Sequence, residues 1–289
     1  MKYIYIVNRF NLEEKSDAII RRLRKVSDEM GRDYEILVNN THAEADAAAE
    51  TYKNGHSIVT AIGGDGSINL LLNRLVGTDN ILSFIPIGTG NDFYHSCSER
   101  LTDGLHEVDI VRINDRYFIN AACFGIDADI ANDDHFIHNR LIPKALRYHA
   151  GVLHHFLTYR KGRDLCVEWE DQRVEKECMT VVAANSRFYG GGYEISPGSV
   201  IDDGVMELYI VDKLSKVQTA RIILSMKKAG HLRHPALQMI RTNRARITAG
   251  EPVVANIDGE KLRSESFDLE LIPKGMKIWM DHEFIKRMR

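Results

Sequence analysis

Several features that would assign this 289-residue chain to a common functional class are missing from its sequence. Lysine and arginine number 38 and aspartate and glutamate 41, which gives a formal net charge of -3 with histidine neutral. A chain without a broad excess of positive charge is a poor candidate for binding nucleic acid. We therefore expect no nucleic-acid partner.

Paired cysteines and long apolar runs are also missing. The four cysteines, Cys97, Cys123, Cys166 and Cys178, form no Cys-x-x-Cys pair, which argues against a zinc site or a disulfide framework. Reduced thiols of this kind are typical of cytoplasmic proteins. No apolar run approaches the roughly 20 residues that a membrane-spanning helix needs. Residues 3–7 are too few for the apolar region of a signal peptide and fit a first strand better.

The most distinctive feature that is present is a glycine turn between a predicted strand and a predicted helix. An apolar run over residues 58–62 stops at Gly63-Gly64-Asp65-Gly66-Ser67. Apolar residues then recur at helical spacing over 68–76, with Ser67 as the expected N-cap. Glycines let the backbone approach a phosphate closely, and the N–H groups at a helix N-terminus favour negative charge. The pattern predicts a phosphate-binding turn.

The same pattern occurs a second time. Residues 81–87 read as a buried strand that ends at Gly88-Thr89-Gly90-Asn91-Asp92. If the two strands are parallel neighbours, Asp65 and Asp92 lie at their carboxyl ends, where open α/β sheets bind ligands. The alternative is a pair of ordinary glycine and aspartate turns that are satisfied by their own backbone. Two such turns in this order favour the ligand-binding interpretation.

The pattern of predicted elements changes near residue 108. Strands and helices alternate over residues 1–107, which predicts an α/β domain with a doubly wound parallel sheet. Short alternating strands follow over residues 108–275 and predict an antiparallel β sandwich. The predicted helices are at 12–30, 43–52, 142–159 and 215–229, and the predicted strands of the sandwich are at 108–113, 117–123, 166–169, 179–184, 205–211 and 244–248.

Two acidic turns in the second predicted domain each allow two interpretations. Ile257-Asp258-Gly259-Glu260 reads as a hairpin with an Asp-Gly corner, yet loops are also where catalytic groups are found. On a strand, Glu260 would share a face with Asp258 and could orient it. Asp202-Asp203-Gly204 reads either as a solvated turn or as a metal-binding turn.

Five motifs, taken in order, resemble the diacylglycerol kinase catalytic domain family of lipid kinases, which includes sphingosine and ceramide kinases and is distantly similar to NAD kinases. Each motif is weak alone, but together they span nearly the whole chain. They are Gly63-Gly64-Asp65-Gly66-Ser67, Pro86-Ile87-Gly88-Thr89-Gly90-Asn91-Asp92-Phe93, Asn120-Ala121-Ala122-Cys123-Phe124-Gly125-Ile126-Asp127-Ala128, Gly190-Gly191-Gly192 with Asp202-Asp203-Gly204, and Ile257-Asp258-Gly259-Glu260.

The resemblance implies a fold like that of NAD kinases and diacylglycerol kinases, with the tail 276–289 returning to the first domain. It implies transfer of the γ-phosphate of MgATP to the hydroxyl of a diacylglycerol-like or sphingoid lipid in the cleft between the domains. Asp258 is the expected general base, and Glu260 is expected to orient it. The expected nucleotide contacts are Asn8, Gly63, Gly64, Asp65, Gly66, Ser67, Gly88, Thr89, Gly90, Asn91 and Asp92, and the expected Mg2+ ligands are Asp65, Asp92, Asp109, Asp202 and Asp203.

Ser67 replaces the threonine that is common in the family and keeps the hydroxyl, and two other departures bear on nucleotide binding. Arg9 follows Asn8 where the family usually has proline, and Leu70 follows Asn69 where it usually has glutamate. These departures leave two alternatives open, namely an NAD kinase and a non-catalytic nucleotide-binding or lipid-binding protein of the same fold. The motif at 88–93 favours the lipid kinases over NAD kinase. The carboxylates retained at the expected site argue against a protein without catalysis.

A lipid substrate implies transient contact of a cytoplasmic protein with the inner face of the membrane. The helix expected at 142–159 has one apolar face and basic flanks, so it can lie on an anionic membrane. Packing of that face on the sandwich is the more common role of such a helix. The basic end at 285–289 has the same two interpretations. The sequence leaves open whether the chain is a monomer or a homodimer.

Overall fold

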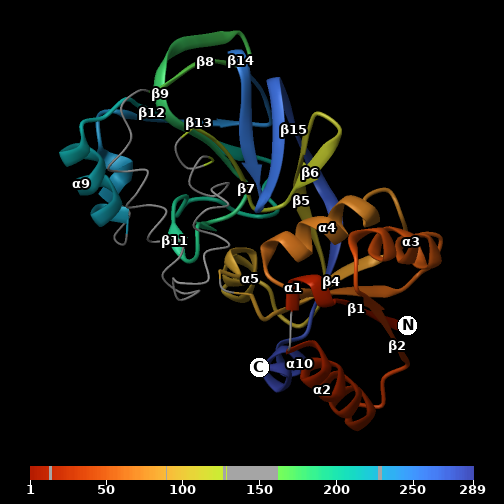
Figure 1. Ribbon diagram of the computed structural model, residues 1–289. Coiled ribbons are helices and arrows are strands. Elements are labelled where there is room, and N and C mark those ends of the chain that lie inside the picture. Colours follow the sequence, from red (N-terminus) through yellow and green to blue (C-terminus); the bar gives the residue numbers. More distant parts are fainter. Residues whose placement is uncertain (13–14, 89, 126–127, 129–161, 227–229) are drawn as a thin grey trace. The chain divides into compact units, whose positions relative to one another are not determined.

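The computed structural model describes residues 1–289 except 13–14, 89, 126–127, 129–161 and 227–229 (Figure 1). The chain divides into two compact units, which we describe separately. The first unit comprises Met1–Val108 together with Lys274–Arg289, and the second comprises Asp109–Pro273. The predicted fold class is confirmed, because the first unit is built on a parallel α/β sheet and the second on antiparallel strands.

The sheet of the first unit has the strand order β2-β1-β3-β4-β15, and neighbouring strands are parallel. The residues of β3 and β4 are all buried and those of β1 are buried except Tyr3, whereas the apolar residues of the edge strand β2 are half-buried. Burial of the inner strands is expected for a sheet that helices cover on both faces. Because the strands are parallel and in register, their carboxyl ends lie at one edge of the sheet. The strands are β1 (Tyr3–Asn8), β2 (Tyr34–Asn39), β3 (Ile58–Gly63), β4 (Ile81–Pro86) and the last residues of β15 (Glu260–Met280).

Helices follow the strands of this sheet. They are α1 (Arg9–Leu12), α2 (Ser16–Glu29), α3 (His42–Tyr52), α4 (Asp65–Leu75), α5 (Asp92–Ser98) and α10 (His282–Met288). The prediction of one helix over 12–30 is wrong at its start, because α2 begins at Ser16 and the short α1 comes directly after β1. Ser67 is not the N-cap of α4. The N-cap is Gly64, which has an extended backbone, and the helix begins at Asp65, two residues before Ser67.

The C-terminal segment is part of the first unit. Ile278 of β15 pairs with Leu82 of β4. The helix α10 then packs on α2, where the guanidinium of Arg32 lies over the rings of Tyr3 and Phe284, 4.4 and 3.7 Å from their centroids. Arg32 also forms an ion pair with Asp281. Such stacking and pairing can hold a terminal helix in place.

The second unit is an antiparallel β sandwich. Its long strands β9 and β14 each pair with β8 at one end and with β7 at the other. One large apolar cluster between the strands forms its core. The elements are β5 (Gly104–Ile113), which begins in the first unit, β6 (Arg116–Phe118), β7 (Ala121–Gly125), β8 (Arg163–Trp169), β9 (Gln172–Ala184), β10 (Phe188–Tyr189), β11 (Tyr193–Glu194), β12 (Met206–Asp212), α9 (Lys216–Met226), the 3-10 helix η2 (Gly230–Arg233), β13 (Leu237–Thr242), β14 (Arg244–Ile257) and β15.

Some elements of the second unit differ from the sequence predictions. The single strand expected over 117–123 is two strands, β6 and β7, because Ile119 and Asn120 leave the ladder and bind other groups through their backbone. The strand expected over 244–248 continues to Ile257 through an irregular pairing after Thr248. The helix expected at 142–159 lies outside the described residues. Among the helices of the described residues, none is both long and apolar enough to cross a membrane.

Candidate functional site

The first glycine turn leads from β3 into α4. Gly64 is the N-cap residue of α4, and no side chain caps this end of the helix. The N–H groups of Ser67 and Ile68 both donate to the carbonyl oxygen of Gly64, at 3.0 and 3.2 Å. Uncapped N–H groups and the helix dipole together make such an end suitable for an anion.

The second glycine turn is closed by the side chain of Asn91. Its Oδ1 accepts from the N–H of Gly88 at 3.0 Å, and its Nδ2 donates to the carbonyl of Gly88 at 2.9 Å. Asn91 has a left-handed backbone with φ of 55°, which asparagine tolerates better than most residues. Thr89, which belongs to the same turn, lies outside the described residues. Asn91 is therefore a residue that shapes the turn from within.

The two glycine turns are in direct contact. The N–H of Ile87 donates to the carbonyl of Gly63 at 3.1 Å. A Cβ atom added to Gly88 would lie 2.5 Å from the Cα of Gly64, so any larger residue would force the turns apart. Glycine is required here by the close approach of two backbones.

Asp65 joins the two turns. Its Oδ2 accepts from the N–H of Asp92 and its Oδ1 from the N–H of Phe93, both at 3.0 Å. The carboxylate thereby caps α5, whereas no side chain caps α4. Burial raises the pKa of the Cys97 thiol well above its ordinary value, and the Asp65 charge raises it further, so this thiol stays protonated.

Two asparagines stand at the same edge of the sheet. Asn8 ends β1 and Asn39 ends β2, the two residues pair in register, and both are buried. Nδ2 of Asn39 donates to Oδ1 of Asn8 at 2.9 Å. Asn8 was expected at the site, whereas Asn39 was not. Its signal in the sequence is the Asn39-Asn40 pair at the end of an apolar strand, which becomes meaningful only when the strand order is known.

In the second unit, Asp258 lies at the corner of the β14–β15 hairpin. Asp258 and Gly259 have positive φ angles of 50° and 98°, as a type I′ turn requires. The Asp258 side chain is buried and accepts three backbone hydrogen bonds, from the N–H groups of Ile119 at 2.8 Å, Asn120 at 3.1 Å and Ala121 at 2.9 Å. The turn is thus both a hairpin corner and the holder of a fixed carboxylate.

Glu260 does not share a face with Asp258, contrary to the expectation from strand alternation. Asp258 is buried and Glu260 is exposed, because the intervening turn interrupts the alternation of the strand. Oδ1 of Asn256 accepts from the N–H of Gly259 at 3.1 Å and so holds the turn from the β14 side. The two carboxylates therefore occupy different environments.

The remaining predicted acidic residues of the second unit are held by other groups. Oδ2 of the buried Asp109 accepts from the N–H of Gly204 at 2.7 Å. Asp203 accepts from the N–H of Val205 at 3.1 Å and from Arg241 at 2.7 Å, and Asp202 is exposed. An arginine thus neutralises Asp203 where the resemblance implied a structural Mg2+.

Arg241 also forms an ion pair with the buried Glu207, at 3.3 Å. Burial raises the pKa of Glu207 despite the hydrogen bond from Ser199 and the nearby Arg241, which both lower it.

The predicted Mg2+ ligands fall into two groups, Asp65 and Asp92 in the first unit and Asp109, Asp202 and Asp203 in the second. Among the described residues, no three histidine, cysteine, aspartate or glutamate side chains are placed to hold a metal ion. Mg2+ does not require such a cage, since it commonly keeps several waters and binds one or two carboxylates together with substrate phosphates. The carboxylate of Asp65 has oxygens that each accept one N–H and keep a further lone pair, which suits that use. The oxygens of Asp203 each accept one hydrogen bond as well, one of them from Arg241.

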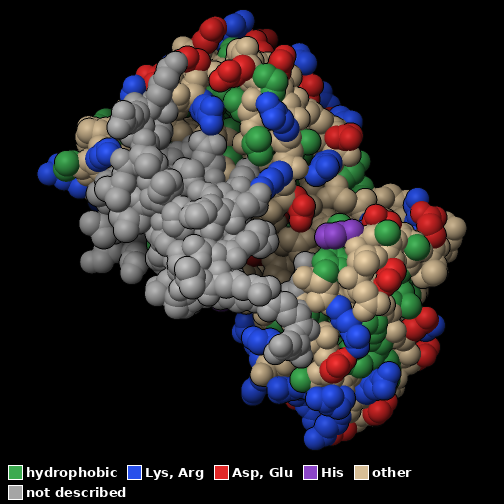
Figure 2. Space-filling view, viewed as in Figure 1, with side chains coloured by type: hydrophobic (Ala, Val, Ile, Leu, Met, Phe, Trp, Pro, Cys, Tyr) green, Lys and Arg blue, Asp and Glu red, His purple; other side chains and the backbone are tan. Residues whose placement is uncertain are grey.

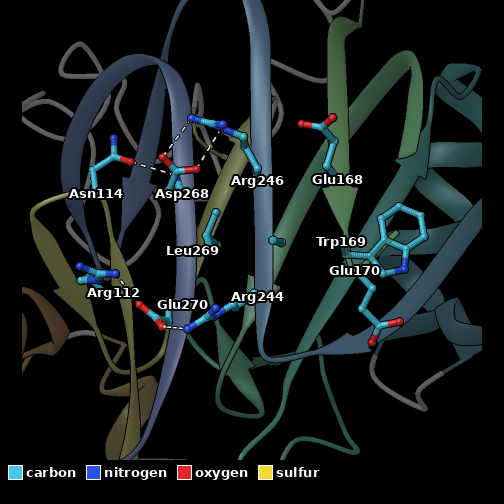
Figure 3. Close-up of a pocket in the computed structure, with 11 residues that line it drawn as sticks. Arg112, Asn114, Glu168, Trp169, Glu170, Arg244, Arg246, Asp268, Leu269 and Glu270 are labelled. Atoms are coloured by element: carbon cyan, nitrogen blue, oxygen red, sulfur yellow. Dashed lines mark hydrogen bonds and ion pairs between the residues drawn. The ribbon is translucent and has the colours of Figure 1, made fainter. Parts of the chain in front are cut away.

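A pocket of about 740 Å³ lies on the second unit (Figure 3). Its arginines are paired with carboxylates, Arg112 and Arg244 with Glu270 and Arg246 with Asp268. Arg246 pairs with Asp268 along the hairpin, while Asp258 is at the corner beyond the pair of Ile257 and Glu260. The pocket is therefore at the other end of the hairpin from Asp258.

Comparison with known proteins identifies two domains in this chain. The model described as diacylglycerol kinase catalytic domain matches residues 2–115. The model described as YegS C-terminal NAD kinase beta sandwich-like domain matches residues 120–280, more than half of the chain.

Individual proteins agree with this result. A diacylglycerol kinase of Bacillus subtilis strain 168 is 26% identical over 242 residues, which cover 76% of this chain and 75% of the relative. An Alcanivorax borkumensis protein named "Probable lipid kinase YegS-like" is 25% identical over 88% of this chain and 90% of its own length. The fold is similar to the crystal structure of a diacylglycerol kinase from Bacillus anthracis strain Sterne, with a TM-score of 0.76, 17% identity and coverage of 97% of each chain. The chain therefore belongs to the family in which a diacylglycerol kinase catalytic domain is followed by a YegS-type C-terminal domain.

Proposed function

We propose that this protein transfers the γ-phosphate of MgATP to the free hydroxyl of diacylglycerol or a closely similar lipid. Its family makes it an ATP-dependent lipid kinase with an alcohol group as acceptor. The observation that carries the proposal is the contact between the two glycine turns, in which Gly88 lies against Gly64 beside the uncapped start of α4.

We assign the phosphates of ATP to the start of α4. Asp65 occupies the start of α5, so that end has no room for a second anion, whereas α4 begins at a glycine without a side-chain cap. Asn91 and Gly88 keep the second turn compact beside it. Backbone N–H groups that are already in place can stabilise phosphate charge without rearranging.

We assign Mg2+ to Asp65 and Asp92, with the phosphates of ATP supplying the other ligands. When bound, the ion would neutralise charge on the transferred phosphoryl group. Each Asp65 oxygen already accepts one N–H and has a further lone pair. Arg9 donates to Asp17 at 2.6 Å, so a contact of Arg9 with a phosphate would have to replace this exposed ion pair.

The lipid hydroxyl must lose a proton during transfer, and we assign its acceptance to Asp258. The three backbone N–H groups fix the direction of this carboxylate, which favours a defined geometry for proton transfer. Glu260 is the second carboxylate of the motif. It is the first residue of β15 and is exposed, and we assign it to orienting the lipid hydroxyl. The two assignments make different predictions, which are argued in the Discussion.

Access to a lipid requires contact with the membrane, and a basic surface of the first unit suits it. Figure 2 shows lysine and arginine side chains gathered where α2 and α10 pack together. A surface of this sign is attracted to anionic lipids. Its residues are Arg21, Arg22, Arg24 and Lys25 of α2 and Lys286 and Arg287 of α10. Glu29 pairs with Lys25 and Arg287, and Glu283 pairs with Arg287, which leaves the other basic residues to supply most of the positive charge. The apolar residues of the C-terminal end, Ile285 and Met288, are buried and so are used in packing instead.

The test is transfer of labelled γ-phosphate from MgATP to mixed micelles of diacylglycerol, monoacylglycerol, sphingosine or ceramide, with NAD in a parallel reaction. Label in diacylglycerol above the other lipids would support the proposal. Label only in sphingosine or ceramide would keep the kinase and change its acceptor. Label only in NADP would identify an NAD kinase, and MgATP binding without transfer to any acceptor would identify a non-catalytic protein.

A further inference from the structure

Three separate segments of the second unit meet at residues 119–121. Asp258 accepts hydrogen bonds from the N–H groups of Ile119, Asn120 and Ala121 at 2.8, 3.1 and 2.9 Å. The direction of the Asp258 carboxylate is therefore set by where this short backbone segment lies. Whatever fixes the segment also fixes Asp258.

Asn185, the first residue after β9, binds the same segment from its carbonyl side. Its Nδ2 donates to the carbonyl of Ile119 at 2.8 Å and to the carbonyl of Asp109 at 3.0 Å. Its backbone N–H donates to the carbonyl of Asn120 at 2.9 Å. Asn185 is fully buried, so these bonds are shielded from water. One amide group thus ties Asp109 to the backbone segment that donates hydrogen bonds to Asp258.

The orientation of the Asn185 amide follows from its partners. Both side-chain partners are carbonyl oxygens, which can only accept, so the NH2 group must face them and Oδ1 must face elsewhere. Oδ1 is buried and accepts no hydrogen bond from the residues that the structure describes. A buried acceptor without a donor works against stability. The stabilising part of this side chain is therefore its NH2 group, which satisfies two carbonyl oxygens of the segment.

We propose that Asn185 is a positioning residue. It holds residues 119–121 in a fixed place relative to Asp109, and these residues in turn hold the Asp258 carboxylate. The proposal rests on the proposed function, because it gives Asp258 a role in phosphoryl transfer. Asn185 acts on the backbone and through Asp258, and it is given no contact with substrate.

The first test is the kinetic effect of Asn185→Ala compared with a matched control. We expect kcat per folded protein to fall roughly 10- to 100-fold, because small misplacements of a reacting group are costly. KM for ATP should not change, since the nucleotide turns belong to the first unit. The control is Asn80→Ala. Asn80 is also buried, donates to the carbonyl of Tyr52 at 2.7 Å and accepts from the N–H of Ser57 at 3.1 Å. Equal kcat per folded protein in both variants would overturn the proposal.

The second test is a double-mutant cycle with Asp258→Asn. If Asn185 acts through Asp258, Asn185→Ala should lower kcat little further once Asp258 has been changed, whereas Asn80→Ala should be additive. Fully additive losses for the Asn185 and Asp258 changes would overturn the proposal. Asn185→Ser keeps one hydroxyl donor and should recover part of kcat. It also serves as the test variant if Asn185→Ala does not fold.

A third measurement separates this inference from the proposed function. If the unmodified protein transfers no phosphate to any lipid, the proposed function fails, but hydrogen exchange of the amides of residues 119–121 remains informative. Faster exchange of these amides in Asn185→Ala, with unchanged exchange in Asn80→Ala, would support the positioning of the segment. Unchanged exchange in the Asn185 variant would overturn it.

Discussion

The carboxylate of Asp65 accepts a hydrogen bond from the backbone N–H of Asp92 at 3.0 Å, and so links the turn before α4 to the first residue of α5. A second bond from Phe93, at the same distance, fixes both carboxylate oxygens. The aspartate of the first glycine motif therefore has a structural task that its position in the sequence does not reveal. It holds together the two turns to which we assign the nucleotide.

Asp65→Asn should weaken MgATP binding roughly tenfold or more. The amide offers one acceptor oxygen in place of two and turns its NH2 group toward a backbone N–H, so one end of α5 loses its cap. Loss of such a cap costs about 0.5–2 kcal/mol of stability. Isothermal titration with MgATP, together with thermal unfolding, would measure both effects.

The control for this variant is Asp281→Ala, which removes the cap of α10, where Asp281 accepts from the N–H of Phe284 at 2.8 Å. We expect this variant to lose stability and to keep its affinity for MgATP. Unchanged affinity in Asp65→Asn would count against assigning the nucleotide to these turns.

Gly88→Ala should disrupt nucleotide binding by separating the two turns. Its Cβ would lie 2.5 Å from the Cα of Gly64 and 2.8 Å from its N atom. Both are backbone atoms, so this clash cannot be relieved by the movement of a flexible side chain. Overpacking of this kind costs about 1–3 kcal/mol. Gly250→Ala is a suitable control, since its Cβ would meet nothing within 4 Å. Equal retention of MgATP affinity in both variants would show that the contact between the turns is dispensable.

Asp258→Asn and Glu260→Gln should have different signatures. We expect Asp258→Asn to lower kcat roughly 100-fold or more, as for loss of a general base, with MgATP binding retained. It should also lower stability, because an NH2 group would face the backbone N–H groups of 119–121. Glu260→Gln, at an exposed position, should lower kcat roughly tenfold and leave stability unchanged.

Steady-state kinetics and urea denaturation of both variants decide between the two carboxylates. A larger loss of kcat in Glu260→Gln than in Asp258→Asn would move the role of proton acceptor to Glu260. Asp258 would then be a residue that only organises the backbone around the hairpin.

The α/β fold of the first unit could be predicted because its strands are short, mostly apolar runs that alternate with stretches of helical spacing. The start of α4 was misplaced for a local reason. Ser67 is a good N-cap residue, but the extended backbone of Gly64 lets the helix begin at Asp65. Cap preference is a weak guide when glycine permits several starting points.

The contacts of the site residues were beyond the reach of sequence patterns. Asp65 and Asp258 are both recognisable in motifs, but their partners lie 27 and 137 or more positions away in the chain. Asn39 and Asn185 belong to no motif that carries chemistry, and they become interesting only once β1 is seen beside β2 and β9 beside β7. The spacing of apolar residues in the sequence predicts which face of a helix or strand is buried. The hydrogen-bond partners of these side chains depend instead on how distant segments pack together.

Glu207 should make the stability of the second unit fall as pH rises. Burial raises the pKa of Glu207 above its usual 4.5, so the folded state binds more protons than the unfolded state between the two values. The contribution of Glu207 to stability is then fully present below the unfolded pKa and is lost as pH rises through the folded pKa. Glu207→Gln removes this dependence. Its urea midpoint, relative to that of the unmodified protein, should therefore improve as the pH rises above the unfolded pKa of 4.5.

Glu270→Gln provides a control of opposite sign. Arg244, and then Arg112, lower the pKa of the half-buried Glu270, so its contribution to stability is present above the unfolded pKa and is lost as pH falls. This variant should be slightly less stable than the unmodified protein at neutral pH and equal to it in acid, with a difference that salt screens. Parallel pH profiles for the two variants would contradict the prediction, because they would mean that burial does not dominate the titration of Glu207.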